Sequence, residues 1–352
     1  MGRSVKYVLV VGAALLSAFV VRRTGSLPPT PYRLSYPPYF GNRTNVGDDN
    51  PLTVEGVALG RRLFYEKRLS RNSTISCASC HQQARAFTDG QAFSVGFDGV
   101  RTRRNSMSLA NLLWVRNFFW DGRASSLEAQ AVVPLTDPHE MGQSMDSSVE
   151  KLRVSGFYET LFGGAFGAGG ITADRIVKAL GQFERTLISA DAPYDKYIRG
   201  EYQLSAEERA GLALFFGRAN CGNCHGGPKT FNETYHNNGL DRVPADSGRA
   251  CVTRMGYDRG RFRVVTLRNI ALTGPYMHDG RFATLGQVMD HYSEHVEPGE
   301  TLSPTLRDTM NVPVQLRLTA VEKNELLAFL RSLTDSAFVT DKKFSDPFVT
   351  LK

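Results

Sequence analysis

Four of the five cysteines stand in two short strings with the same spacing. The strings are Cys77-Ala-Ser-Cys80-His81 and Cys221-Gly-Asn-Cys224-His225. Thiols three positions apart lie about one helical turn apart, and the adjacent histidine can present its imidazole to a metal. C-x-x-C-H is the attachment signature of c-type haem, in which the thiols bind the vinyl groups and the histidine binds the iron. We therefore predict two covalently bound haem c groups.

A zinc site and a thiol redox pair are the rival interpretations of these cysteines. Zinc ribbons bring paired cysteines together across roughly 15 to 20 residues, whereas Cys80 and Cys221 are 141 positions apart. Tetrahedral zinc would also not require a histidine after each pair. The two strings together favour haem, and the fifth cysteine, Cys251, is expected to be a free thiol.

An internal repeat accompanies the two motifs. The string from Ser108 to Leu127, with Trp120-Asp-Gly-Arg at its centre, recurs from Thr266 to Leu285 around His278-Asp-Gly-Arg, at an offset of 158 residues. Each copy follows its own C-x-x-C-H string. The segment between haem histidine and repeat is 14 residues longer in the second copy. We interpret the chain as two tandem cytochrome c-like haem domains related by internal duplication.

The two halves differ at one position that matters for iron. Tyr292 stands fourteen residues after His278, and Pro134 stands fourteen residues after Trp120. A phenolate can ligate iron, whereas proline has no donor. We therefore expect the second iron to be closed by a side chain and the first to stay open. The alternatives to Tyr292 on the same predicted helix are three: Met289, His291 and His295.

Capping signals predict a mainly α fold. Ser205 with Glu208 forms a capping box before an apolar run that leads to Cys221, and Thr319 with Glu322 caps a helix near the end of the chain. A further amphipathic stretch runs from Val54 to Tyr65. No convincing alternating strand pattern appears.

The N-terminus predicts export. An apolar run of 15 residues, Tyr7 to Val21, lies between basic residues, and it is shorter than the ~20 residues that cross a bilayer untilted. We expect residues 1–24 to be a signal peptide or an N-terminal membrane anchor. The protein would then be periplasmic, with a tether to the inner membrane as the alternative. Residues 25–45 read as a proline-rich linker, 46–195 and 196–340 as the two haem domains, and 341–352 as a tail.

The net charge of +7 does not indicate nucleic acid, because the basic residues are scattered along the sequence. An anionic redox partner is compatible with it. His139 and His236 are interpreted as surface or loop residues. Four charged residues of the repeat are expected to brace haem propionates and turns: Asp121, Arg123, Asp279 and Arg281.

The chain resembles the bacterial di-haem cytochrome c peroxidase and MauG family. The resemblance rests on both haem motifs, on FFWDGRASSLEAQ from Phe118, on DPHEMG from Asp137, and on TLRNIALTGPYMHDGRFATL from Thr266. It implies a peroxidatic N-terminal haem, Trp120 between the haems, a distal glutamine at Gln130 and an acid-base glutamate at Glu140. It also implies a calcium ion, held by the Asn105 side chain and the carbonyls of Thr273 and Pro275.

Three departures from the family pattern narrow the resemblance. Reductively activated peroxidases carry a distal histidine where this chain has Phe97, and a methionine where it has Tyr292. Both changes are similar to the MauG-like subgroup and imply a first haem that is open in the ferric state. MauG also has a tryptophan two residues before its second motif, where this chain has Ala219. Maturation of a quinone cofactor is therefore not carried over.

These observations predict a hydrogen peroxide-dependent oxidoreductase. Glu140 would transfer a proton between the two peroxide oxygens, Gln130 would orient the peroxide, and Trp120 would pass electrons between the haems. The electrons would come from a small cytochrome c, a cupredoxin or a protein substrate. The alternatives are a di-haem electron carrier without peroxidase activity and a di-haem oxygenase.

Overall fold

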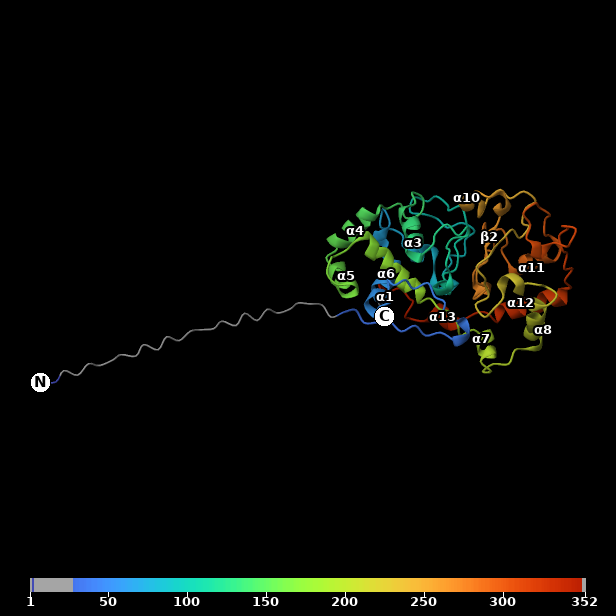
Figure 1. Ribbon diagram of the computed structural model, residues 1–352, viewed down its shortest axis with the longest axis horizontal. Coiled ribbons are helices and arrows are strands. Elements are labelled where there is room, and N and C mark those ends of the chain that lie inside the picture. Colours follow the sequence, from blue (N-terminus) through green and yellow to red (C-terminus); the bar gives the residue numbers. More distant parts are fainter. Residues whose placement is uncertain (1, 3–27, 350–352) are drawn as a thin grey trace.

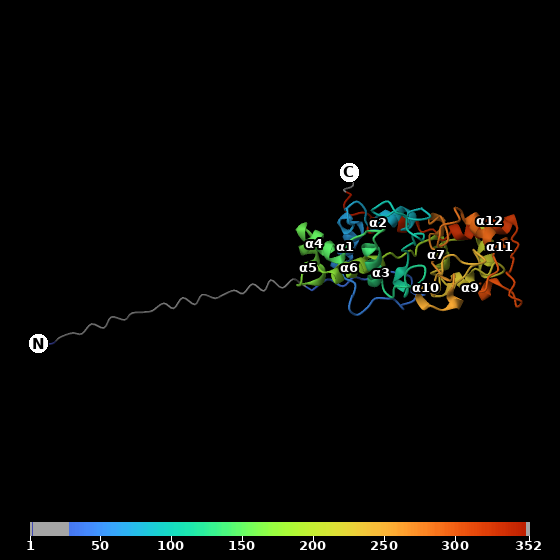
Figure 2. The same ribbon diagram turned by 90° about the horizontal axis from the view of Figure 1, so that it is seen from above.

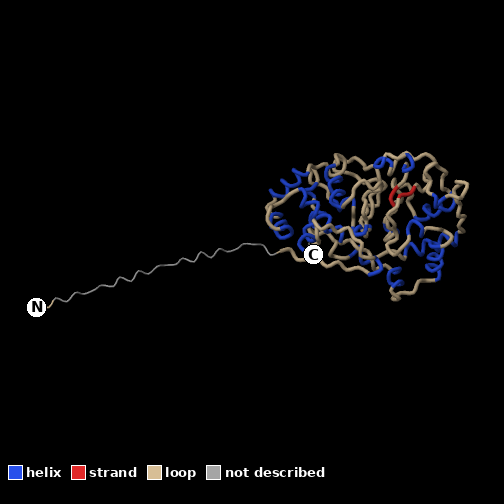
Figure 3. Tube along the Cα trace, in the orientation of Figure 1, coloured by secondary structure: helices blue, strands red, loops and turns tan. Residues whose placement is uncertain are grey.

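The computed structural model describes residues 2 and 28–349, and the expected signal peptide or anchor lies outside them apart from Gly2. The fold is mainly helical, as predicted, with one short antiparallel pair of strands (Figure 3). The helices and strands are, in order, α1 (Val54–Tyr65), α2 (Cys77–Cys80), α3 (Leu127–Thr136), α4 (Met145–Val154), α5 (Tyr158–Phe166), α6 (Ala173–Arg185), α7 (Pro193–Ile198), α8 (Ala206–Phe216), α9 (Gly222–His225), β1 (Tyr235–His236), α10 (Ala250–Thr253), β2 (Phe262–Arg263), α11 (Leu285–Glu294), α12 (Ala320–Arg331) and α13 (Ser336–Thr340). Among these residues, no helix is long and apolar enough to cross a membrane.

The predicted helix starts are found where the capping residues stand. Helix α1 has the bounds expected from its apolar pattern, and the Thr53 side chain accepts from the Gly56 amide. Ser205 and Glu208 form the expected capping box of α8, and Thr319 and Glu322 form that of α12. Each box satisfies amide groups that would otherwise lack partners at the helix start.

Two hydrophobic cores lie side by side along the molecule (Figures 1 and 2). Helices α1, α3, α4, α5 and α6 surround the first core, and α8, α11 and α12 surround the second. The last residues of the chain return to the first core, because Phe338 and Phe344 pack against Phe87. Residues 341–349, expected as a tail, are therefore anchored there through Phe344, which is 2 % exposed.

A close helix crossing of the same kind occurs in both cores, between α1 and α6 in the first and between α8 and α12 in the second. A Cβ atom added to Gly60 of α1 would lie 1.9 Å from the carbonyl oxygen of Ala179 on α6 and 2.9 Å from Phe183 Cβ. One added to Gly211 of α8 would lie 1.9 Å from the carbonyl oxygen of Glu325 on α12 and 2.9 Å from Phe329 Cβ. Only glycine lets the two backbones approach this closely.

The sequence repeat is accompanied by matching local conformation. Asn111 and Asn269, 158 residues apart, both have left-handed backbone angles, with φ of 62° and 63°. Their amides donate to the carbonyls of Leu187 and Leu333 at 2.9 and 3.0 Å. Helices α3 and α11 start 158 residues apart, at Leu127 and Leu285.

The segment expected as a linker packs against the first unit. Between residues 28 and 45 the chain has only short local structure, including a 3-10 turn over Pro38–Phe40. Phe40 is 1 % exposed, and its ring and that of Tyr36 meet Trp114 edge-on at 5.2 and 5.0 Å. These aromatic contacts fix the segment to the body of the protein.

Candidate haem sites

The first C-x-x-C-H motif begins with the one-turn helix α2 and ends at His81. The Nδ1 atom of His81 lies 2.8 Å from the carbonyl oxygen of Phe87 and can donate to it. A proton held at Nδ1 leaves the Nε2 lone pair free for a metal. Burial lowers the pKa of His81, which favours the neutral, ligating form.

The second motif has the same arrangement around α9. His225 Nδ1 lies 3.1 Å from the carbonyl oxygen of Val265 and 3.3 Å from that of Thr230. Burial lowers the pKa of His225 to about 4. Burial also raises the pKa of the Cys221 thiol to about 12.

A cavity of about 700 Å³ opens beside the second motif. Its lining includes Cys221, Cys224 and His225 together with apolar residues such as Leu326 and Leu330. An enclosed apolar space with two thiols and an imidazole at its wall suits a flat, hydrophobic macrocycle. The residues therefore fit a covalently attached haem.

Arg263 supports the same interpretation and was missed at the sequence level. Its side chain lines the cavity and is 7 % exposed, and burial lowers its pKa. Within residues 28–349 its guanidinium forms no ion pair, and its Nε donates to the carbonyl of Phe119 at 3.3 Å. A haem propionate would supply the missing negative charge.

Tyr292 also lines this cavity. Its hydroxyl accepts a hydrogen bond from Asn238 Nδ2 at 3.2 Å, and burial raises its pKa to about 12. Met289 is in the lining too, whereas His291 and His295 are not. The His291 Nε2 atom instead lies 3.0 Å from the carbonyl oxygen of Asn238. Two of the four candidates on this helix can thus face the second haem.

The residues expected on the far side of the first haem come from α3 and the turn after it. Gln130 and Pro134 are one turn apart on α3 and share a face. The turn folds back onto the helix, because the Met141 amide donates to the carbonyl of Pro134 at 3.0 Å. This contact brings Glu140 beside Pro134. Burial raises the pKa of Glu140, nearby Asp137 raises it further, and Arg123 opposes the rise.

Trp120 lines the cavity of the second motif and is linked by hydrogen bonds to the surroundings of the first. Its Nε1 donates to the carbonyl of Asn105 at 2.9 Å. One residue further on, the Ser106 hydroxyl donates to the carbonyl of Cys80 at 2.8 Å. Two hydrogen bonds and one peptide step therefore connect Trp120 with the first motif.

The three residues expected to hold calcium line the same cavity. They are Asn105, Thr273 and Pro275. The Asn105 side-chain nitrogen donates to the carbonyl of Gln91 at 2.8 Å, which turns the amide oxygen away from that carbonyl. In the described part of the chain, no three side chains of His, Cys, Asp or Glu gather as a metal cluster.

The two histidines and the charged residues of the repeat can be compared with the predictions made for them. His236, interpreted as a surface or loop residue, lies on β1, lines the cavity and contacts Ser303 Oγ at 2.7 Å, so that prediction is wrong. His139 is exposed, as expected. The acid and arginine after Trp120 pair with each other, as do those after His278; Asp121 also pairs with the more distant Arg104, and Arg281 with the more distant Asp241.

Comparison with known proteins places this arrangement in a family. The family model for di-haem cytochrome c peroxidases matches residues 54–203. Methylamine utilization protein MauG of Methylorubrum extorquens is 40% identical over 291 residues, which cover 81% of this chain and 79% of the relative. Cytochrome c551 peroxidase of Nitrosomonas europaea is 33% identical over 290 residues, or 81% of each chain.

A solved structure gives the same result. A MauG-like protein associated with microbial copper homeostasis has a TM-score of 0.84 and 38% sequence identity, over 90% of this chain and all of the other. The chain belongs to the di-haem cytochrome c peroxidase and MauG family. Membership of this family implies two haem c groups.

Proposed function

We propose that the protein is an exported, periplasmic di-haem peroxidase. It reduces hydrogen peroxide at an open N-terminal haem, and electrons from a protein donor reach that site through a C-terminal haem ligated by His225 and Tyr292. The observation that carries the proposal is the difference between equivalent positions. Tyr292 lines the cavity beside the second motif, whereas the position fourteen residues after Trp120 is Pro134, which has no donor.

Bound haem supplies the iron that polarises peroxide, and the chain supplies the proton transfer. Glu140 is held partly buried with a raised pKa, so its carboxyl retains a proton to a higher pH than an exposed glutamate and is suited to acid-base work. It takes the proton from the inner peroxide oxygen and gives it to the outer one. Gln130, on the same side of α3 as Pro134, holds the peroxide in line.

Tyr292 and Trp120 act in electron transfer rather than in proton transfer. If Tyr292 holds the second iron, it would do so as a phenolate whose proton is released to solvent, and its negative charge would favour the more oxidised metal by electrostatic attraction. Asn238 donates a hydrogen bond to the same oxygen and limits this effect. Trp120 lies between the sites and passes electrons from the second to the first.

Duplication and calcium complete the proposal. The paired helix crossings at Gly60 and Gly211 support an origin of the two domains, 46–195 and 196–340, from one ancestral haem unit. Calcium, bound by Asn105, Thr273 and Pro275, would fix the positions of the two domains relative to each other.

Low-temperature EPR of the ferric protein tests the proposed asymmetry. One high-spin and one low-spin haem are expected, and cyanide should shift the Soret band. Two low-spin signals without a cyanide response would instead indicate an electron carrier. Oxygen consumption with an organic substrate in the absence of peroxide would indicate an oxygenase.

Two variants test the assigned residues. Glu140→Gln should slow peroxide turnover by about 10²-fold or more, the contribution of a lost acid-base group. Undiminished turnover would remove Glu140 from the mechanism. Tyr292→His should convert the second haem to bis-histidine ligation, and an unchanged spectrum would show that another residue, such as Met289, holds that iron.

A further inference from the structure

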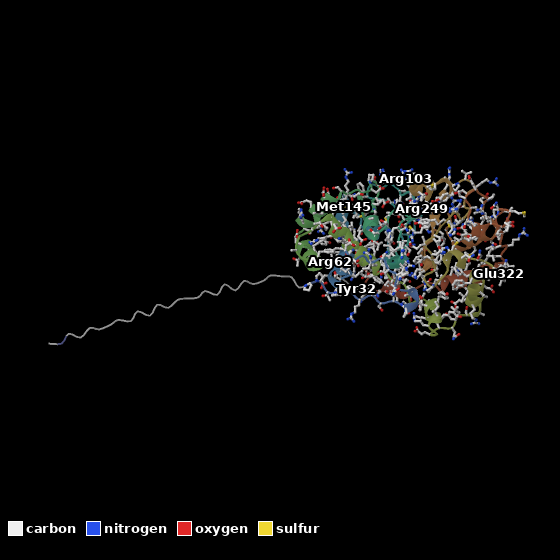
Figure 4. The ribbon with its side chains drawn as sticks, viewed as in Figure 1. Tyr32, Arg62, Arg103, Met145, Arg249 and Glu322 are labelled. Carbon is white, nitrogen blue, oxygen red and sulfur yellow. The ribbon has the colours of Figure 1, made fainter. Side chains whose placement is uncertain are left out.

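Two arginine-rich segments that lie far apart in the sequence meet at one edge of the folded protein. Residues 100–104 and 241–261 together contain eight arginines, three aspartates and no lysine. The Arg104–Asp246 ion pair, with Nε to Oδ2 at 2.7 Å, joins the two segments. Figure 4 shows Arg103 and Arg249 together at the edge where α10 lies in Figure 1.

Five of these arginines are exposed and form no ion pair with any described residue: Arg101, Arg103, Arg242, Arg254 and Arg259. The three aspartates are already engaged, because Asp246 pairs with Arg104, Asp241 with Arg281 and Asp258 with Arg261. The positive charge at this edge is therefore not neutralised within the described part of the chain.

Large apolar side chains are exposed among these arginines. Val243 is 70% exposed, Tyr257 62% and Met255 50%. We call the five unpaired arginines and these three residues the arginine surface. Tyrosine, methionine and arginine are enriched in protein interfaces and lysine is depleted, so this composition favours a protein partner over a lipid or nucleic acid surface.

The arginine surface is anchored to the turn that carries Trp120. Arg249 donates to the carbonyls of Asp121 and Gly122 at 2.8 and 2.9 Å. Arg104 bridges Asp246 and Asp121. The Arg263 amide donates to the Trp120 carbonyl at 2.7 Å. A protein bound here would lie against the backbone that positions the aromatic ring between the two sites.

We propose that the arginine surface binds an acidic redox protein and places it against the Trp120 turn, from which its electrons enter the second haem site, whose cavity Trp120 and Arg263 line. The inference rests on the proposed peroxidase function and names the partner's charge and entry point. Reduction of one hydrogen peroxide to two waters takes up two protons and two electrons. A one-electron donor is therefore oxidised in each of two encounters.

The test uses the holoenzyme and an acidic cupredoxin as the probe. The triple variant Arg242→Glu, Arg254→Glu, Arg259→Glu should lower the second-order rate of peroxide-dependent cupredoxin oxidation at low salt at least tenfold, because steered association depends on charge. The matched control reverses three exposed basic residues elsewhere, Arg43→Glu, Lys67→Glu and Lys342→Glu. It should change the rate less than twofold.

Binding without turnover gives an independent readout. Calorimetry with oxidised cupredoxin and no peroxide should show an affinity that falls with salt and is lost in the triple variant only. Equal losses in both triple variants, or no binding to the wild type at low salt, would overturn the proposal. Loss of binding to phosphatidylglycerol vesicles, with the cupredoxin rate unchanged, would assign the surface to a membrane instead.

Failure of the peroxidase function would look different. Turnover with a small reduced dye should be the same in the wild type and in both triple variants. A wild type that cannot reduce peroxide with the dye contradicts the proposed function, while the calorimetry still reports on the arginine surface.

Discussion

Replacing Glu184 should remove a pH dependence of stability that the buried carboxyl imposes. Glu184 lies on α6, is 6% exposed, and its Oε2 atom has no hydrogen-bond partner among the described residues. The equivalent position on α12, one residue after the paired Phe183 and Phe329, is Leu330, which lines the cavity beside the second motif. Burial raises the pKa of Glu184 from its ordinary 4.5 to about 8.

The direction of the effect follows from proton binding. Between pH 4.5 and about 8 the folded protein keeps the Glu184 proton that the unfolded chain releases, so the free energy of unfolding falls as pH rises. Each pH unit costs about 1.4 kcal/mol while the folded state stays protonated. From pH 5 to pH 7 the loss is roughly 3 kcal/mol.

Urea unfolding of the holoprotein, followed by far-UV circular dichroism at pH 5, 6 and 7, measures this loss. Glu184→Gln keeps the shape and cannot ionise, so its advantage over the wild type should grow by roughly 3 kcal/mol across the series. Glu150→Gln, at an exposed position on α4, is the control and should track the wild type. A constant difference between wild type and Glu184→Gln at all three pH values would refute the reasoning.

Three further predictions concern packing, electron transfer and charge. Gly60→Ala or Gly211→Ala should lower the thermal midpoint, because overpacking of this kind costs about 1–3 kcal/mol; Gly163→Ala on α5, with nothing within 4 Å of its added Cβ, is the control, and equal midpoints in all three would contradict the crossing. Trp120→Phe should slow electron exchange between the haems in stopped-flow experiments while cyanide binding stays unchanged, and unaltered exchange would exclude the bridging role. Arg263→Gln should lower the midpoint potential of the second haem, because a lost positive charge favours the ferric state; a potential that rises or stays constant would exclude Arg263 as a propionate partner.

Local signals in the sequence were sufficient for the helices that meet the haem motifs. Helices α1, α8 and α12 were predicted because their caps and apolar stripes are encoded within single segments. The helical hairpins around α4 and α5 were not predicted. Their cores depend on contacts with α1 and α6 that no local pattern reveals.

Site residues could be predicted where a sequence motif fixes their spacing along the chain. They could not be predicted where folding brings together residues that are far apart in the sequence. The two C-x-x-C-H strings and the position of Tyr292 could be read from the chain. Arg263 and Glu184 carry no sequence signal, because each owes its unusual environment to burial by segments far away in the sequence. His236 was misjudged for the same reason, since only the pairing of β1 with β2 turns it toward the cavity.

The return of the C-terminal segment to the first core has a consequence for the first haem motif. Phe338 and Phe344 close over Phe87, whose carbonyl fixes the orientation of His81. The first core is therefore incomplete until residues 336–344 have folded onto it. A deletion of these residues would disturb the carbonyl that orients His81, although they lie more than 250 positions away in the sequence.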